Sequence, residues 1–149
     1  MAFRGDFEPH GRAYVHRFRV AAGDIDDLGH ANNVVWVRWV NEAAEAQAEQ
    51  LGLGKAGLRA LSVLWVVRRH DIEYLLPARV GDELEAITWA HTLSGATSLR
   101  RTLFVRDGQK LARAETTWVM VDMSTQRARR VPEAIYGAYG FETRDPPER

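Results

Sequence analysis

Residues 24–42 read Asp-Ile-Asp-Asp-Leu-Gly-His-Ala-Asn-Asn-Val-Val-Trp-Val-Arg-Trp-Val-Asn-Glu, and they join a predicted strand to a long predicted helix. The first half combines carboxylates, a glycine, a histidine and two asparagines, as loops do. The second half begins a helical pattern. The free N–H groups and the positive dipole end of a helix stabilise a developing negative charge. A carboxylate beside such a helix start suits attack on a thioester or a similar carbonyl.

The composition indicates an ordinary globular protein. The chain has 149 residues, of which 46% are hydrophobic and 27% charged, and a chain of this size buries roughly two-thirds of its unfolded surface. Twenty basic and twenty acidic side chains cancel, so no overall field attracts nucleic acid or an anionic membrane. The absence of cysteine excludes disulfides and thiolate catalysis and fits a cytoplasmic location. No apolar run is long enough to predict a membrane span.

The chain shows one continuous pattern of elements, which predicts a single domain over residues 12–142. Residues 1–11 contain two glycines and a proline and are predicted to form an N-terminal arm. The polar, proline-rich residues 143–149 are predicted to form a flexible tail.

Two periodicities divide this domain into elements. Residues 14–20 alternate, with Tyr14, His16, Phe18 and Val20 on one face, which predicts a strand. Residues 33–51 have a helical period, with Asn32 or Asn33 as the N-cap and Gly52 as the stop. The later elements are strands over 62–75, 83–93, 98–106 and 110–122, a hairpin turn at Asp107-Gly108, and a short helix over 133–139 opened by Pro132.

The order of these elements predicts the fold class. A strand, a loop and a long helix precede four strands that are joined by hairpin-like turns, and such strands form an antiparallel sheet. One face of that sheet must be covered, and the long helix is available to cover it. The sequence therefore predicts an α+β layer in which the sheet wraps around the helix.

Two segments carry a resemblance to a known family. Asp24–Asn33 contains Asp-x-Asp-x-x-Gly followed by His-Ala-Asn-Asn, and Tyr74–Asp82 reads Tyr-Leu-Leu-Pro-Ala-Arg-Val-Gly-Asp. Both resemble motifs of the hotdog-fold thioesterases, specifically the 4-hydroxybenzoyl-CoA thioesterase-like branch and its acyl-ACP thioesterase relatives. Val119–Asp122 and Pro132-Glu133 match later positions of the same family. The resemblance spans about residues 12–140.

This resemblance implies a fold, an activity and an assembly. The fold is the hotdog fold, an antiparallel β-sheet wrapped around one long central α-helix. The implied activity is hydrolysis of an acyl-CoA or acyl-ACP thioester, with Asp26 as nucleophile or general base and the N-terminus of the following helix as oxyanion hole. In this family the sheets of two subunits join and each site lies at their interface, which implies a homodimer or a tetramer.

The candidate site residues follow from these motifs. The catalytic candidates are Asp26, His30 and Asn33, whereas Asp24 and Asp27 are interpreted as structural. The substrate-binding candidates are Gly29, Val34, Val35, Trp36, Arg100 and Arg101: the loop glycine, the first helical turn, an aromatic for the acyl group, and two arginines for CoA phosphates.

Each candidate also has a structural interpretation, and these alternatives stay open. Asp26 is a common turn residue, His30 a hydrogen-bonding loop residue, and Asn33 a helix cap. The five histidines lack metal-ligand spacing, so neither a metal nor a cofactor is expected. The plant enzymes have Asn where this chain has Leu28, and the His-Gly-Gly motif of helical-Glu relatives is absent. A non-catalytic acyl-thioester-binding or scaffold protein on the same fold is the alternative.

Overall fold

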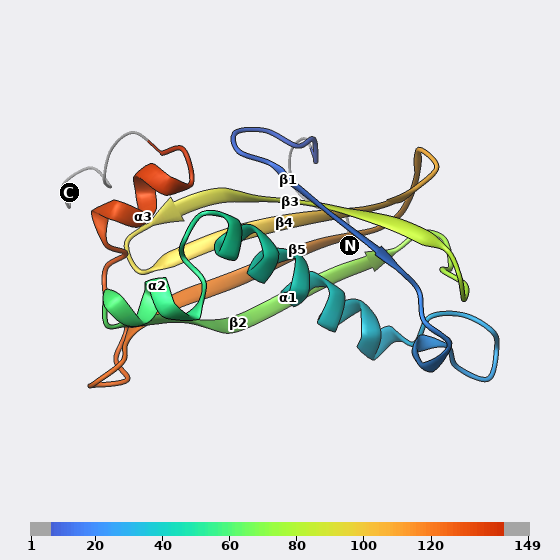
Figure 1. Cartoon of the computed structure of the whole chain (residues 1–149), viewed down its shortest axis with the longest axis horizontal. Helices are drawn as coiled ribbons and strands as arrows, with labels where there is room; N and C mark the ends of the chain where they lie inside the picture. The colour runs from blue at the N-terminus through green and yellow to red at the C-terminus, as the bar shows by residue number, and fades with distance from the viewer. Residues whose placement is uncertain (1–6, 142–149) are drawn as a thin grey trace.

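The computed structural model describes residues 7–141 of the chain and shows a curved antiparallel sheet with a long helix along one face (Figure 1). The sheet has five strands in the order β1-β3-β4-β5-β2. The strands are β1 (Tyr14–Arg19), β2 (Val63–Tyr74), β3 (Glu83–Ser94), β4 (Thr97–Arg106) and β5 (Gln109–Asp122). The predicted tail over 143–149 and residues 1–6 of the predicted arm lie outside the described residues.

The long helix α1 (Asn33–Gln50) confirms the predicted element almost to the residue. Its buried side chains recur at intervals of three and four, as a helix on a sheet requires: they are Trp36, Trp39, Val40, Ala43, Ala44 and Gln47. Gly52 ends the helix with a positive φ of 75°, as expected. Val34, a predicted substrate-binding residue of the first helical turn, is 75% exposed.

Three short helical segments complete the fold. The helix α3 (Glu133–Ala138) follows Pro132 as predicted, whereas α2 (Lys55–Ala60) and the 3-10 turn η1 (Ala22–Asp24) were not predicted. Segments of six and three residues are too short to show a helical period, because a period needs at least two full turns. Figure 1 shows α2 and α3 at one end of the sheet and the loop before α1 at the other end.

The strand connections are only partly those that the sequence predicted. The turn Asp107-Gly108 has φ values of 49° and 80° and joins β4 to β5 as a two-residue hairpin. The expectation of a hairpin-like link between β2 and β3 was wrong, because β2 pairs with β5 and β3 pairs with β1. The link crosses the molecule instead, and on its way the Ala78 carbonyl accepts from the Ala31 N–H at 2.8 Å.

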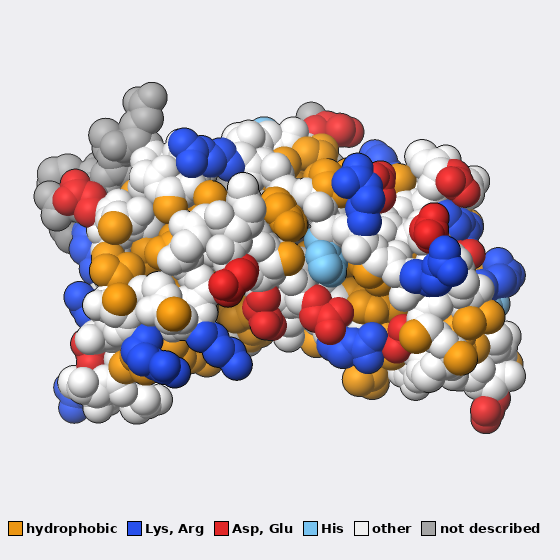
Figure 2. Space-filling model, viewed as in Figure 1, with side chains coloured by type: hydrophobic (Ala, Val, Ile, Leu, Met, Phe, Trp, Pro, Cys, Tyr) orange, Lys and Arg blue, Asp and Glu red, His pale blue; other side chains and the backbone are white. Residues whose placement is uncertain are grey.

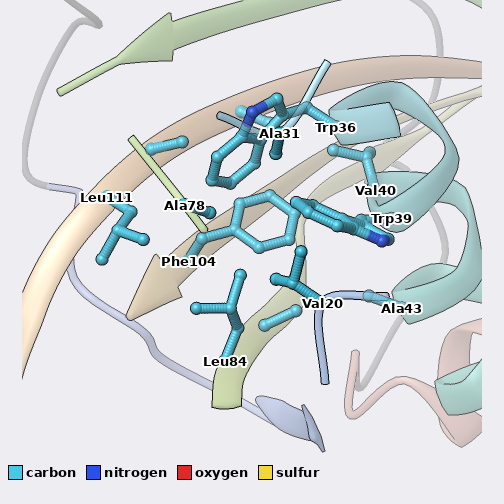
Figure 3. Packing of buried hydrophobic residues seen from close by; sticks show 13 residues of the cluster. Val20, Ala31, Trp36, Trp39, Val40, Ala43, Ala78, Leu84, Phe104 and Leu111 are labelled. Atoms are coloured by element: carbon cyan, nitrogen blue, oxygen red, sulfur yellow. The ribbon is translucent and has the colours of Figure 1, made fainter. Parts of the chain in front are cut away.

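Within the described residues, the core consists of three groups of buried side chains. The first lies between the start of α1 and the sheet and is centred on aromatic rings (Figure 3). The second lies at the end of α1, against α3 and the sheet. The third lies on the outer face of the sheet, where Phe7 packs on Trp89 with ring centroids 5.6 Å apart. Phe7 therefore anchors the predicted N-terminal arm at its described end.

Among the register shifts of the described sheet, the bulges in β2 and β3 change which side chains face α1. The register is interrupted between Val67 and Arg69 in β2 and between Ala90 and Thr92 in β3. Each bulge adds one residue to its strand, and a shift of one residue exchanges the two faces. Even-numbered side chains of β3 are therefore buried against α1 before the bulge, whereas the odd-numbered Leu93 is buried beyond it.

Candidate active site

The candidate site is a closed loop directly before α1. The Asp26 N–H donates to the His30 carbonyl at 2.8 Å, and the Asn32 N–H donates to the Asp24 carbonyl at 2.9 Å. Gly29 lies at the tip with a φ of 82°, a conformation that glycine adopts without strain. A β-carbon at this position would meet no atom within 4 Å, so the backbone conformation alone requires the glycine.

The Asp26 carboxylate has two different oxygens. Oδ1 accepts hydrogen bonds from the Leu28 N–H at 2.9 Å and from the His30 N–H at 3.3 Å. Oδ2 makes no hydrogen bond with any residue of 7–141, and the side chain is half-buried. The turn interpretation and the catalytic interpretation are therefore compatible: one oxygen fixes the loop, while the other is free to react with water or a carbonyl carbon.

Asp24 is the buried carboxylate of the loop. It is 5% exposed; Oδ1 accepts from Arg38 Nη2 at 2.9 Å, and Oδ2 accepts from the Ala21 N–H at 3.0 Å. Arg38 also lies 3.5 Å from Glu42, one helical turn further along α1. This geometry agrees with the structural interpretation of Asp24, which joins the end of η1 to the first turns of α1.

Asn32, rather than Asn33, caps the helix. Its Oδ1 accepts from the Val34 N–H at 3.0 Å, and its carbonyl accepts from the Val35 N–H at 2.9 Å. Asn33 is the first helical residue and is exposed, and neither its N–H nor its side chain makes a hydrogen bond within the described part of the chain. Among the N–H groups of Asn33, Val34 and Val35 at the start of the helix, only that of Asn33 makes no hydrogen bond with residues 7–141.

Trp36 lies in the core rather than on an open acyl site. It is 2% exposed, and its ring centroid lies 4.9 Å from that of Trp39 and 5.1 Å from that of Phe104 (Figure 3). The helical period explains this, because Trp36 falls on the buried stripe of α1. Trp36 is thus a core residue in the described chain, and its role in lining an acyl site stays a prediction. Val35 packs on the same core, and Val34 points to solvent.

Arg100 and Arg101 are both buried rather than at the surface, and their binding of CoA phosphates stays a prediction. They are 5% and 4% exposed, because β4 is the central strand of the sheet. Their side chains point to opposite faces, as neighbours on a strand do. Arg101 lies on the outer face, where Nε pairs with Glu115 at 2.8 Å and the guanidinium stacks on Phe7. Arg100 lies on the face that α1 covers.

A cavity of about 730 Å³ lies beside Arg100, between the second half of α1, α2 and the sheet. Charged side chains from α1 and α2, including Glu45, Glu49, Lys55 and Arg59, contribute to its lining. Most of the remaining lining is apolar, and includes Leu53, Leu58, Val63, Trp65, Leu93 and Met123. On the α1 face of the molecule, acidic and basic side chains are interspersed among hydrophobic ones (Figure 2).

The sequence analysis missed this cavity, although two features pointed to it. Gln47 falls on the apolar stripe of α1, and a polar residue there needs a buried partner. Two consecutive arginines on one strand cannot both face solvent when the sheet is covered on one side. Together they indicate a buried arginine near a buried polar residue of α1, and the structure shows that this arginine is Arg100, which donates to Gln47.

The cavity and the Asp26 loop lie at opposite ends of α1. At a rise of about 1.5 Å per residue, Ala44, the first cavity residue on α1, lies roughly 16 Å along the axis from Asn33. The aromatic core around Trp36 and Phe104 fills the intervening space (Figure 3). The two features are therefore separate within one chain.

Other sites are not apparent between residues 7 and 141. His70 Nδ1 lies 2.9 Å from Thr116 Oγ1, and burial lowers the pKa of this histidine, as in a satisfied core residue. Within the described range, no three His, Cys, Asp or Glu side chains form a group that could hold a metal ion. No helix in that range is long and apolar enough to cross a membrane.

Comparison with known proteins identifies relatives over most of the chain. A family model for the acyl-ACP thioesterase N-terminal domain matches residues 11–139. The oleoyl-acyl carrier protein thioesterase 1 of Arabidopsis thaliana is 27% identical over 145 residues, which cover 91% of this chain and 40% of that protein. The chain thus spans less than half the length of the curated plant relatives that it matches.

Solved structures confirm the predicted α+β hotdog fold. The crystal structure of an oleoyl thioesterase from Lactobacillus plantarum has a TM-score of 0.85 at 22% identity, and the match covers 93% of this chain and 55% of that one. A hypothetical protein from Thermus thermophilus has a TM-score of 0.78 at 29% identity, and the match covers 84% of this chain and 95% of that one. The second match shows that a chain of similar length forms this fold.

Proposed function

Because this chain belongs to the acyl-ACP thioesterase family, we propose that it hydrolyses an acyl thioester at the start of α1. The observation that carries the proposal is the Asp26 carboxylate, whose Oδ1 is fixed by two backbone N–H groups while Oδ2 accepts no hydrogen bond from the described residues. A positioned carboxylate with one free oxygen can act as a general base or as a nucleophile.

The first residue of α1 completes the proposed chemistry. The thioester oxygen would face the unused Asn33 N–H and the positive end of the helix dipole, which stabilise the negative charge of the tetrahedral intermediate. Water adds to the carbonyl carbon as Oδ2 of Asp26 takes its proton, the C–S bond breaks, and the thiolate leaves and is protonated. In the nucleophilic route Oδ2 attacks first, and water then cleaves the resulting anhydride. The Asn33 amide and the His30 side chain are proposed to position the substrate.

An oxygen-isotope experiment separates the two routes. In a single turnover in ¹⁸O-labelled water, a general base places the label in the product acid alone. A nucleophile releases the first product with unlabelled oxygen from Asp26 and leaves the label on the enzyme when water attacks the aspartyl carbon. Label detected by mass spectrometry in the peptide that contains Asp26 shows the nucleophilic route, whereas attack of water on the acyl carbon of the anhydride would label the acid alone, as a general base does.

The proposed active assembly is a homodimer. β2 is an edge strand of twelve residues, and such an edge presents unpaired backbone groups. Antiparallel pairing of β2 with its copy about a two-fold axis would extend the sheet and reverse the partner's direction. The partner's Asp26 loop would then reach the end of the sheet where α2 lies (Figure 1), and residues of α2 line the cavity. Each active site would thus combine the Asp26 loop of one chain with the cavity of the other chain.

The test is a hydrolysis screen over aromatic, short and long acyl thioesters on both CoA and acyl carrier protein. We expect turnover of at least one acyl class by the wild type and loss of most of it in Asp26→Asn. Asp27→Asn is the matched control, since Asp27 is an exposed neighbour. Binding of acyl thioesters with no turnover by the wild type would instead support a non-catalytic acyl-binding protein.

A further inference from the structure

We propose that the cavity beside α2 binds the far end of the acyl group and prefers an acyl chain that ends in a carboxylate, held by Arg100. This inference rests on the proposed function for the presence of an acyl substrate. It goes beyond that function because it assigns the chemical character of the acyl group. Three observations support it: the burial of a cation, its lack of an anionic partner, and its position on the wall of a largely apolar cavity.

Arg100 is held by neutral groups. Nη1 donates to Gln47 Oε1 at 2.6 Å and to Thr88 Oγ1 at 3.1 Å, and Cζ lies 5.5 Å from the centre of the Tyr139 ring. Burial raises the pKa of Tyr139, so its phenol is neutral at neutral pH. No salt bridge joins Arg100 to a carboxylate within residues 7–141. The guanidinium is thus a buried charge without a counter-charge in the described chain.

Such a charge is unfavourable unless something compensates for it. Burial lowers the pKa of Arg100, but the ordinary pKa of arginine is so high that the guanidinium stays protonated. An unpaired buried ion is destabilising, and a paired one much less so. The second buried arginine on this strand shows the usual solution, because Arg101 pairs with Glu115 at 2.8 Å. A ligand carboxylate would give Arg100 the partner that Arg101 already has.

The surroundings of Arg100 hold it ready for a ligand. Gln47 Nε2 donates to the Arg12 carbonyl at 2.6 Å, which fixes the amide oxygen toward Arg100. Thr88 Oγ1 lies within 3.2 Å of both the Arg101 carbonyl and Thr102 Oγ1. A guanidinium fixed in this way loses little freedom when a carboxylate binds, and fixed geometry favours affinity.

The cavity around Arg100 fits an acyl chain. Its walls are formed largely by aliphatic and aromatic side chains from α1, α2, β2 and β3, which match methylene groups. A single buried cation in such a wall matches a chain with one terminal anion. A phosphate of the carrier is a second source of anionic charge, and the experiment below separates the two sources.

The test compares binding of two stable substrate analogues of equal length. These are S-alkyl-CoA thioethers with and without a terminal carboxylate, measured by calorimetry, so that no turnover is required. We expect the wild type to bind the carboxylate analogue at least about tenfold more tightly, in the range of one hydrogen-bonded charge pair. Arg100→Met should abolish this preference, and Arg100→Lys should keep part of it. Arg17→Met, which removes an exposed arginine of β1, should leave it unchanged.

The outcomes separate the alternatives. A wild type that binds both analogues equally, or prefers the plain alkyl chain, overturns the proposal, and this result needs no variant. An unchanged preference in a folded Arg100→Met also overturns it. If Arg100→Met weakens both CoA analogues equally but not their pantetheine counterparts, the anion is a carrier phosphate and the acyl proposal fails. Binding with the expected preference but without hydrolysis of any thioester would reject the proposed function and keep this inference.

Discussion

At the scale of single residues, two carboxylates of one loop have different environments although they are two positions apart. Asp24 is buried and pairs with Arg38, whereas Asp26 is half-buried and has a free oxygen. The sequence predicted this division from the motif, but not its physical basis. The basis is the loop closure between Ile25 and Ala31, which turns one side chain inward and leaves the next available.

Asp26→Asn should lower kcat by roughly 10²-fold or more, because the amide neither accepts a proton from water nor attacks a carbonyl. The amide oxygen can still accept from the Leu28 N–H, so folding and analogue binding should be preserved. Steady-state kinetics and calorimetry on the same preparation measure both quantities. Turnover close to wild type in the folded variant would remove Asp26 from the mechanism.

Asp24→Asn should instead act on stability. It replaces the charge that binds Arg38 in a site that is 5% exposed, and the expected loss is about 2 kcal/mol in the free energy of unfolding. Arg38→Met offers the reciprocal change from the other partner. Denaturant unfolding measures both, and a variant as stable as the wild type would contradict the structural role of Asp24.

At the scale of elements, the two asparagines at the start of α1 have different roles: Asn32 caps the helix, and Asn33 is exposed. Asn32→Ala should destabilise the protein by about 1 kcal/mol, because the Val34 N–H loses its acceptor. Asn33→Ala should leave stability nearly unchanged and lower kcat/KM. Thermal melts and kinetics on this matched pair give the comparison. A loss of stability in Asn33→Ala but not in Asn32→Ala would show that Asn33 caps the helix in solution.

A second element-scale prediction concerns the crossing link between β2 and β3. Asp82 Oδ2 accepts from the Arg79 N–H and from Arg106, and Arg106 also donates to the Pro77 carbonyl. Burial alone would raise the pKa of Asp82, but these bonds and the Arg106 charge outweigh it, so the pKa lies below its ordinary value. A depressed carboxyl pKa stabilises the fold above the unfolded pKa, and this stabilisation is lost as the pH falls through the folded one.

Asp82→Asn should therefore lower Tm by a few degrees at pH 7 and by less near pH 3. Melting curves of wild type and variant across this range measure the difference, with Asp107→Asn as a control at an exposed hairpin position. A difference in Tm that does not depend on pH would show that the lost turn geometry, rather than the charge, matters.

The elements themselves were largely predictable, and their arrangement was less so. The periods of β1 and α1 are local properties of the sequence, and their bounds were correct to within a residue or two. The pairing of β2 with β5 joins segments about fifty residues apart, and no local pattern specifies it. The same limit applies to Trp36 and Arg100: their residue types suggested surface roles, whereas the position of each element in the layer buries both.

At the scale of the whole molecule, the unpaired edge of β2 leads to a prediction about assembly. We expect a dimer at micromolar concentration, because the exposed edge strand also presents apolar side chains such as Val66 and Tyr74, which are 44% and 45% exposed. Sedimentation velocity across a dilution series measures this directly. A fully active monomer would contradict the shared site.

A mixed dimer tests whether each site combines two chains. One chain of the mixed dimer carries Asp26→Asn and lacks the carboxylate. The other chain carries Arg100→Met and lacks the cation. If the loop of one chain serves the cavity of its partner, a mixed dimer contains one intact site. Co-refolding should then restore up to about a quarter of wild-type activity on the carboxylate-ended substrate, since about half of randomly mixed dimers are heterodimers. If loop and cavity act within one chain, mixing restores nothing.

The bulges in β2 and β3 are positions where the sheet can accommodate the deletion of one residue. Within a regular strand, deletion of one residue moves every side chain beyond it to the opposite face of the sheet, and this usually destabilises the fold. At Arg68 or His91 the deleted residue would be the extra one, so the ladder would become regular and only the half-strand at the cavity would invert. Val63 and Trp65 would then turn away from α1, and Leu64 and Val66 would turn toward it. The loss of a single codon would thus alter the cavity wall while the Asp26 loop at the other end of α1 stays unchanged.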